Sequence, residues 1–298
     1  MTAGYLDFID SVLSAGAQVA RRMFGGRQAS GRGEDRNQVV TEADLRIGSL
    51  MSERIRRAFP EHTIIEEENG VLADKGRCAW VLDPIDGTSN FAAGSPLYAI
   101  MIGLVEDGRP VAGGVVMPAL CQTYLAERGG GLFRNGTRLT PAQPTDLSEA
   151  LVAYGFDIHS AGQCAWECSL MARIAPHCAG IRASNSAFDA VMTACGVYGA
   201  YINRSNRIWD CVAPHVLVQE GGGKYTTLDG SPIGYDRPAQ RVHDNFEVLA
   251  SGGTWHDDLV GLVNAFTESR DWGDGDTPAR GIRHGDRHRQ LHQSGGAT

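Results

Sequence analysis

The stretch Trp80-Val-Leu-Asp-Pro-Ile-Asp-Gly-Thr-Ser-Asn-Phe91 joins a short apolar run directly to two carboxylates and a polar turn. Functional side chains are often found where a buried strand feeds a loop. Asp83 and Asp86 stand three residues apart across Pro84, so both carboxylates can point into one pocket. Hard divalent cations prefer oxygen ligands of this kind. We therefore predict a metal site centred on this stretch.

Gly87 and Thr88 follow the second carboxylate and open a predicted helix. Backbone N–H groups at a helix start bind phosphate well. The Thr88 hydroxyl can also orient a water molecule. The stretch thus combines candidate metal ligands with a candidate phosphate site.

Three further acidic features accompany this stretch: Asp44, the run Ile64-Ile-Glu-Glu-Glu68, and Trp209-Asp210. Each has an ordinary interpretation when taken alone. The glutamate run can be a solvated face, Asp44 can be a first-turn acid favoured by the helix dipole, and Asp210 can be a helix cap. Taken singly, these three features favour the ordinary interpretations, whereas the nine-residue context of Trp80–Thr88 is far more specific than a pair of acids.

The 298-residue chain is 42% hydrophobic and carries a formal net charge of −8, with no outstanding basic patch. Nucleic acid is therefore an unexpected partner. The N-terminus carries acids where a signal peptide carries bases, and the apolar stretches are too short to span a bilayer. We expect a cytoplasmic protein without a membrane partner. The seven scattered cysteines are expected to be reduced thiols.

The periodicity of apolar residues predicts alternating helices and short strands. Helices are expected over 4–24, 41–59, 164–175, 186–195 and after Trp209; strands are expected over 63–67, 78–82, 98–105, 110–116, 123–127, 131–133, 151–155 and 199–202. The segment Pro141–Pro144 is the expected boundary between an N-terminal α+β half (1–143) and a C-terminal α/β half (144–268). Residues 269–298 lose apolar side chains and are expected to form a disordered tail.

The four acidic segments together resemble the inositol monophosphatase family, which is metal-dependent and lithium-sensitive. The matching segments stand in the family's order: Val40-Thr-Glu-Ala-Asp44, Ile64-Ile-Glu-Glu-Glu68, Trp80–Phe91, and Trp209-Asp-Cys-Val-Ala-Pro-His-Val-Leu-Val-Gln-Glu-Gly-Gly-Gly223. Agreement over four motifs is far more specific than any one of them. The resemblance implies a layered α-β-α-β-α sandwich, like that of inositol monophosphatases and fructose bisphosphatases, and a homodimer.

The resemblance also implies roles for individual residues. Two to three Mg²⁺ ions would be held by Glu67, Asp83, the Ile85 carbonyl, Asp86 and Asp210. Glu66 or Glu68 would replace Glu67 if the register slipped by one residue. Thr88 and Glu67 would hold the attacking water, Asp44 would accept the Thr88 hydroxyl, and Gly87 and Thr88 would bind phosphate. The substrate would meet Asp86, Asn185, Ser186, Ala187, Asn203, Arg204 and Asp210.

The chain departs from the family pattern on the substrate side. Asn203-Arg-Ser-Asn206 stands where an acid that recognises inositol is expected, and Asn185-Ser186 replaces a glycine-threonine pair. Arg32 or Arg36 stands in the loop that often holds a lysine. We therefore expect hydrolysis of a small phosphate monoester: an inositol-phosphate-like compound, a sugar phosphate or histidinol phosphate. Alternatives are a nucleotide or secondary-metabolite intermediate as substrate, or a non-catalytic metal- or phosphate-binding regulator on the same fold.

Overall fold

The computed structural model describes residues 4–25, 29–31, 39–142, 146–156, 161–253 and 255–269. Arg32, Arg36 and the predicted tail beyond Ser269 lie outside these residues. No helix in the described ranges is long and apolar enough to cross a membrane.

Seven α-helices and two large sheets organise the described chain. The helices are α1 (Tyr5–Met23), α2 (Glu42–Ala58), α3 (Thr88–Ala93), α4 (Ala161–Ile174), α5 (Ala187–Ala194), α6 (Ile208–Glu220) and α7 (His256–Glu268). The first large sheet contains β3 (Thr63–Glu66), β4 (Gly70–Ala73), β5 (Cys78–Asp86), β6 (Ala99–Glu106), β7 (Arg109–Met117), β8 (Gln122–Glu127), β9 (Gly131–Arg134) and β10 (Thr137–Arg138), in the order β10-β9-β8-β7-β6-β5-β3-β4.

The second sheet contains β11 (Leu151–Tyr154), β12 (Gly180–Arg182), β13 (Ala200–Asn206), β14 (Lys224–Thr226) and β15 (Phe246–Ser251), in the order β12-β11-β13-β15-β14. A separate two-stranded ribbon pairs β1 (Ala29–Gly31) with β2 (Val39–Thr41). The two large sheets fall on opposite sides of the predicted boundary segment at residues 141–144.

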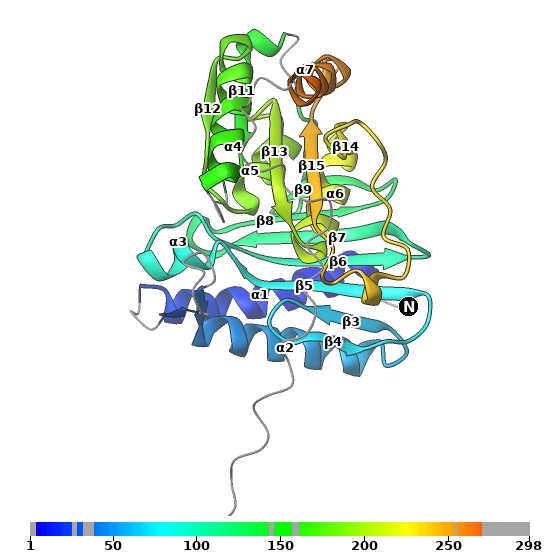
Figure 1. Cartoon of the computed structure of the whole chain (residues 1–298). Helices are drawn as coiled ribbons and strands as arrows, with labels where there is room; N and C mark the ends of the chain where they lie inside the picture. The colour runs from blue at the N-terminus through cyan, green and yellow to red at the C-terminus, as the bar shows by residue number, and fades with distance from the viewer. Residues whose placement is uncertain are drawn as a thin grey trace, which may run out of the picture.

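The elements stack as five layers, with α1 and α2 on one outer side and α4 and α7 on the other (Figure 1). Three hydrophobic cores define the layers. One lies between α1, α2 and the large sheet. A second surrounds α5 and α6 between the two sheets. The third lies between the second sheet, α4 and α7. This arrangement confirms the predicted α-β-α-β-α sandwich.

Side-chain alternation along the strands explains the layering, because successive residues of a strand point to opposite faces. On β5, Trp80 and Leu82 belong to the core beside α1 and α2, whereas Val81 belongs to the core around α6. On β13, Tyr201 belongs to the α6 core and Ile202 to the core beside α4 and α7. Both faces of each sheet are therefore covered by helices.

The predicted helices and strands are found, although α4 begins at Ala161 rather than at residue 164 and α6 begins at Ile208, before Trp209. Thr41 caps α2 through a capping box with Asp44, as its sequence position predicts. Two strands are longer than predicted, since β5 continues to Asp86 and β13 to Asn206. The strands β1, β2, β4, β10, β12, β14 and β15 and the helix α7 were not predicted. All of these strands except β15 have only two to four residues, too few for a clear alternation.

A glycine pair lets α6 approach the large sheet closely. Gly103 of β6 and Gly113 of β7 are ladder partners. A Cβ atom at Gly103 would lie 2.5 Å from Val212 Cγ1, and one at Gly113 would lie 2.9 Å from the Ala213 Cα atom. Because α6 carries Asp210 in its first turn, this close packing sets the height of that carboxylate above the sheet.

We predict that Gly113→Ala destabilises the protein by about 1–3 kcal/mol, because the added methyl group meets backbone that cannot rotate away. Thermal and denaturant unfolding would measure the change. The control is Gly261→Ala in α7, where nothing lies within 4 Å of the new Cβ. That change should be neutral or stabilise by up to about 1 kcal/mol. Equal stability of the two variants would contradict this account of α6 packing.

Candidate metal centre

Two parallel strands bring Glu67 and Asp83 to the same edge of the large sheet. β3 pairs in parallel with β5, with Glu66 opposite Leu82. The residues that follow this pair, Glu67 and Asp83, therefore lie side by side at that edge. The Glu67 N–H donates to the Leu82 carbonyl at 3.2 Å. The Glu67 and Asp83 carboxyl groups are hydrogen-bonded to each other. An irregularity in the β5–β6 ladder between Asp83 and Asp86 then turns the chain toward α3.

Asp210 joins this edge from the middle helical layer. It lies in the first turn of α6, where its Oδ2 accepts a hydrogen bond from the Arg207 N–H at 2.6 Å. One carboxylate oxygen from each of Asp83, Asp86 and Asp210 lies within 4.8 Å of the others. The structure thus brings together acids that are separated by more than a hundred residues in the chain.

The chemistry of these oxygens fits a cation. Asp83 is 2% exposed, and its Oδ1 atom is buried without a hydrogen-bond partner among the described residues. Buried carboxylates are normally paired with a cation or a full set of donors. Clustered carboxylate oxygens are also the ligands that Mg²⁺ uses.

Burial and neighbouring negative charges raise the pKa values of Glu67 and Asp83. Burial raises the pKa of Glu67 to about 8, and the neighbouring Asp210 charge adds to this effect. Burial likewise holds the pKa of Asp83 well above its usual range, followed by the charges of Glu67, Asp86 and Asp210. A cation among these groups would favour their ionised forms.

The register at the glutamate run places Glu67, rather than its neighbours, beside Asp83. Glu66 is fully buried, and its carboxylate accepts hydrogen bonds from the Glu68 N–H at 3.1 Å and the Asn69 N–H at 3.0 Å. Glu66 therefore closes the turn between β3 and β4. Since Glu66 pairs with Leu82 across the parallel strands, the next residue, Glu67, lies beside Asp83 and hydrogen-bonds to it.

Asp44 and Thr88 meet at the other side of the cluster. Asp44 is fully buried. Its Oδ2 accepts the Thr41 N–H at 2.8 Å and the Thr41 hydroxyl, while its Oδ1 accepts from Thr88 Oγ1 at 3.3 Å. Thr88 Oγ1 is also 2.8 Å from the Ile85 carbonyl oxygen. Burial raises the pKa of Asp44, and the hydrogen bonds from Thr41 and Thr88 oppose that rise.

Gly87 and Thr88 lie at the start of α3, directly after Asp86. Gly87 has a positive φ of 75°, a conformation that glycine adopts without strain. A Cβ atom there would lie 2.9 Å from the Ser186 Cβ. The start of α3 therefore lies directly against the residues that precede α5.

The predicted substrate residues 185–187 lie at this contact. The Ala187 N–H donates to Asp86 Oδ2, and Ser186 caps α5 by accepting from the Phe188 N–H at 3.3 Å. The Asn185 side chain points elsewhere. Its amide accepts from the Phe156 N–H at 2.9 Å and donates to the Phe156 carbonyl at 2.8 Å.

Asn203 and Arg204 lie on opposite faces of β13. Asn203 is 8% exposed and bonds to the Tyr201 hydroxyl at 3.0 Å and the Ser205 N–H at 2.8 Å. The Arg204 guanidinium lies 3.7 Å from the centre of the Trp166 ring and pairs with Glu167 at 3.1 Å and Glu247 at 2.9 Å. These partners of Arg204 are not residues of the acidic cluster.

Two residues at the site were not predicted from the sequence. Asn90 donates from Nδ2 to the Leu97 and Ser184 carbonyls, both at 2.8 Å, and so ties α3 to the segment before α5. Asp189 accepts the Ser184 N–H at 2.9 Å. Asn90 lies inside the Trp80–Phe91 stretch, and its position there could have identified it as a candidate site residue. No local sequence signal points to Asp189.

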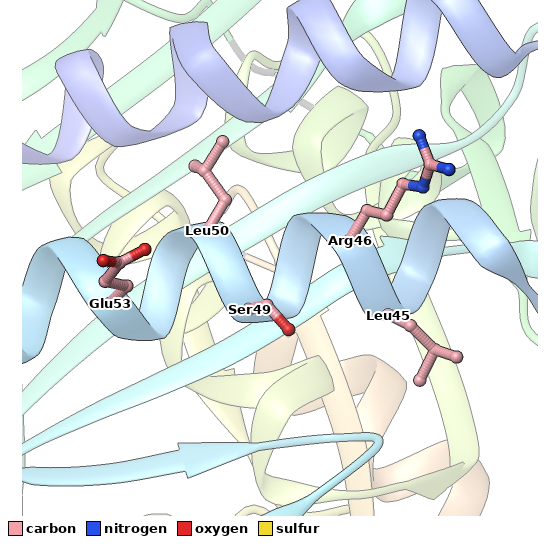
Figure 2. A pocket seen from close by; sticks show the side chains of 5 residues that line it. All are labelled: Leu45, Arg46, Ser49, Leu50 and Glu53. Atoms are coloured by element: carbon pink, nitrogen blue, oxygen red, sulfur yellow. The ribbon is translucent and has the colours of Figure 1, made fainter.

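An open depression on the surface lies apart from this cluster. Figure 2 shows that Leu45, Arg46, Ser49, Leu50 and Glu53 line it, all from the single helix α2. None of these five residues belongs to the acidic cluster, although Leu45 follows Asp44 in sequence. The depression therefore does not mark the candidate site.

The fold of this chain is shared with solved structures of inositol monophosphatases. The inositol monophosphatase of Thermotoga maritima is 28% identical, with a TM-score of 0.78, and the match covers 89% of this chain and 98% of that one. The Anabaena inositol monophosphatase is 28% identical with a TM-score of 0.74, covering 87% of this chain and 95% of that one.

Sequence comparison identifies the family. The sequence pattern of the Inositol monophosphatase family matches residues 6–268. The probable inositol 1-monophosphatase ImpA of Mycobacterium tuberculosis is 35% identical over 263 residues, which cover 86% of this chain and 93% of that protein. The Nus factor SuhB of Escherichia coli is 32% identical, with coverage of 68% and 76%. The chain belongs to the inositol monophosphatase family, as its motifs predicted.

We predict that the metal-free protein loses stability as the pH rises. Glu67 has a pKa of about 8 when folded, against an ordinary value of 4.5. The folded protein therefore binds this proton more tightly than the unfolded chain, so the free energy of unfolding falls as the pH rises between those values. Thermal unfolding in chelator from pH 5 to pH 8.5 would measure the slope.

Asp83→Asn should reduce this slope, because the Asp83 carboxyl itself has a raised pKa in the folded protein and the variant removes that titrating group. The exposed Glu53→Gln serves as the control, since Glu53 lies on α2 outside the cluster. A wild-type slope unchanged by Asp83→Asn would contradict the view that charge crowding weakens the metal-free fold.

Proposed function

We propose that this chain is a Mg²⁺-dependent phosphatase that hydrolyses a small phosphate monoester by in-line attack of a water molecule. The observation that carries the proposal is the cluster of Asp83, Asp86 and Asp210 oxygens within 4.8 Å of one another, with the buried Asp83 Oδ1 lacking a partner among the described residues. Family membership supports the reaction class.

Two to three Mg²⁺ ions would be held by Glu67, Asp83, the Ile85 carbonyl, Asp86 and Asp210. Bound Mg²⁺ supplies a more readily ionised water and neutralises charge on the phosphate oxygens. The protein's part is to fix the ligand oxygens in place, which it does by anchoring them on β5, on the end of β3 and on α6.

Thr88 and Asp44 orient the attacking water. A hydroxyl has one hydrogen to donate and retains lone pairs to accept. When Thr88 Oγ1 donates to Asp44 Oδ1, 3.3 Å away, its lone pairs can accept a hydrogen bond from the water. The shorter contact of Thr88 with the Ile85 carbonyl would be given up when that carbonyl serves as a ligand. Glu67 accepts a second hydrogen bond from the same water.

The phosphate group is held by the N–H groups of Gly87 and Thr88, since α3 begins there with its amide hydrogens unpaired within the helix. Donors fixed in advance stabilise charge that develops on phosphate oxygens in the transition state. The left-handed conformation of Gly87 supports this role by turning the chain sharply between Asp86 and the helix.

The leaving group meets Asp86, Asp210, the 185–187 segment and Asn203. We propose that Ala187 and Ser186 contribute chiefly through the backbone, because the Asn185 amide is occupied by Phe156. Asn203 stands in place of an acid, and its own amide is hydrogen-bonded to the Tyr201 hydroxyl and the Ser205 N–H. A neutral residue at this position suits a sugar phosphate, histidinol phosphate or nucleotide as well as an inositol phosphate. Relatives from Aquifex aeolicus and Thermotoga maritima are named fructose-1,6-bisphosphatase/inositol-1-monophosphatase. We also propose a cytoplasmic, lithium-sensitive homodimer.

A second candidate is a regulator on the same fold, favoured by the relatives named Nus factor SuhB. The complete carboxylate set with Thr88 supports catalysis over this alternative, because a non-catalytic protein has no need to retain every ligand.

We predict Mg²⁺-dependent phosphate release from a panel of monoesters that includes inositol 1-phosphate, fructose 1,6-bisphosphate, histidinol phosphate and a nucleoside monophosphate. Chelator and lithium should each suppress release. Asp83→Asn should lower kcat at least about 100-fold, because it removes a shared ligand of the cluster. Absence of metal-dependent release from any ester would refute the enzyme proposal, and full activity of Asp83→Asn would refute the assigned site.

We predict that Asp44→Asn lowers kcat by about 100-fold or more while changing KM little, because a positioned proton acceptor contributes about 10²–10⁴-fold. Thr88→Val should have a similar effect, whereas Thr88→Ser retains the hydroxyl and should retain most activity. Steady-state kinetics under saturating Mg²⁺ would measure each variant. Equal activities for Thr88→Val and Thr88→Ser would exclude a role for the hydroxyl.

A further inference from the structure

The turn formed by residues 184–187 connects the carboxylate cluster to α5. From this turn the Ala187 N–H donates to Asp86 Oδ2, and the Ser184 carbonyl accepts from Asn90 Nδ2 at 2.8 Å. The turn also crowds Gly87, whose Cβ position lies 2.9 Å from the Ser186 Cβ. Its position therefore bears directly on where Asp86 and the start of α3 lie.

Asp189 holds this turn from within α5. It is fully buried, and its Oδ2 accepts the Ser184 N–H at 2.9 Å. The Asn185 N–H and the Ser184 hydroxyl also hydrogen-bond to this carboxylate. Its second oxygen, Oδ1, is buried without a hydrogen-bond partner in the described ranges. Within the described residues, the hydrogen bonds to this buried carboxyl group therefore come from Ser184 and Asn185, both in the turn.

Two sets of contacts hold the turn. Asn185 has a positive φ of 51°, a conformation that asparagine adopts more readily than most residues with a side chain. The Asn185 amide pairs with the Phe156 backbone, and Asp189 accepts hydrogen bonds from Ser184 and Asn185. Burial raises the pKa of Asp189 to about 6, and the hydrogen bonds from Ser184 and Asn185 oppose that rise.

We propose that Asp189 is a positioning residue for the phosphatase reaction: it fixes the 184–187 turn so that the Ala187 N–H holds the Asp86 carboxylate in its ligand orientation. This inference rests on the proposed function, since it assigns Asp86 to the metal site. Asp189 acts through the turn and makes no contact with the substrate. The alternative is that Asp189 has a purely structural role, in which its negative charge in the first turn of α5 is stabilised by the helix dipole.

Hydrogen exchange tests the tether without using activity. Asp189→Ala should speed exchange of the Ser184 and Ala187 amides by on the order of tenfold, because protection reflects the local opening free energy. Asp189→Asn keeps an acceptor oxygen toward the turn and should stay within about threefold of wild type. Thr193→Val is the matched control, because Thr193 is buried one turn further along α5 and its hydroxyl donates to the Asp189 carbonyl at 3.0 Å.

The Mg²⁺ dependence of phosphate release tests the consequence. Asp189→Ala should raise the Mg²⁺ concentration for half-maximal activity about tenfold, because residues that orient ligands typically contribute 10- to 100-fold to metal affinity or activity. Asp189→Asn should restore most of the wild-type value, and Thr193→Val should leave it unchanged at a temperature where every variant is folded.

If Asp189→Ala and Thr193→Val changed amide exchange and the Mg²⁺ requirement to the same extent, Asp189 would have only a structural role. That result would overturn the proposal. An unchanged Mg²⁺ requirement in Asp189→Ala, despite faster exchange, would also overturn it. A wild-type protein without Mg²⁺-dependent release refutes the proposed function instead. The exchange comparison then still decides whether Asp189 holds the turn against Asp86.

Discussion

The repulsion among clustered carboxylates is the constraint on which the rest of this structure depends. Asp86 and Asp210 lie close enough to Glu67 and Asp83 to raise the pKa values of those two acids, and Asp83 is almost wholly buried. Such a group of acids weakens a fold unless something compensates it. A five-layer sandwich with three hydrophobic cores supplies rigid elements on which the acids are held in place.

Contacts of the middle helical layer with the large sheet determine where Asp210 and Asp86 lie. α6 lies against the glycine pair Gly103 and Gly113, so the packing of a helix from the second half fixes the height of Asp210 above β5. The 184–187 turn does the same for Asp86 through the Ala187 N–H. The candidate site is therefore made by contacts between halves, and neither sheet alone could assemble it.

Chemistry and substrate choice fall on different parts of this arrangement. The carboxylates, Thr88 and Asp44 belong to elements with both faces packed, which suits groups that must be held rigidly. The proposed substrate side consists of the turn before α5 and the last residues of β13. The polar side chains there bind other parts of the protein: Asn185 pairs with Phe156, and Arg204 pairs with Glu167 and Glu247. Asn203 likewise bonds to the Tyr201 hydroxyl and the Ser205 N–H.

The sequence by itself determined the family, the layered fold and the identity of the clustered acids. Local patterns carry this information, because Thr41 and Asp44 form their capping box within one turn and Asp83 and Asp86 follow a single strand. The family resemblance pointed to Glu67 but left Glu66 and Glu68 open, and the parallel pairing of β3 and β5 sets the register that puts Glu67 beside Asp83. Tertiary structure also turned Arg204 away from the cluster and placed Asp189 beneath the turn. These positions depend on which strand faces and helix ends meet in space, and no short stretch of sequence encodes that.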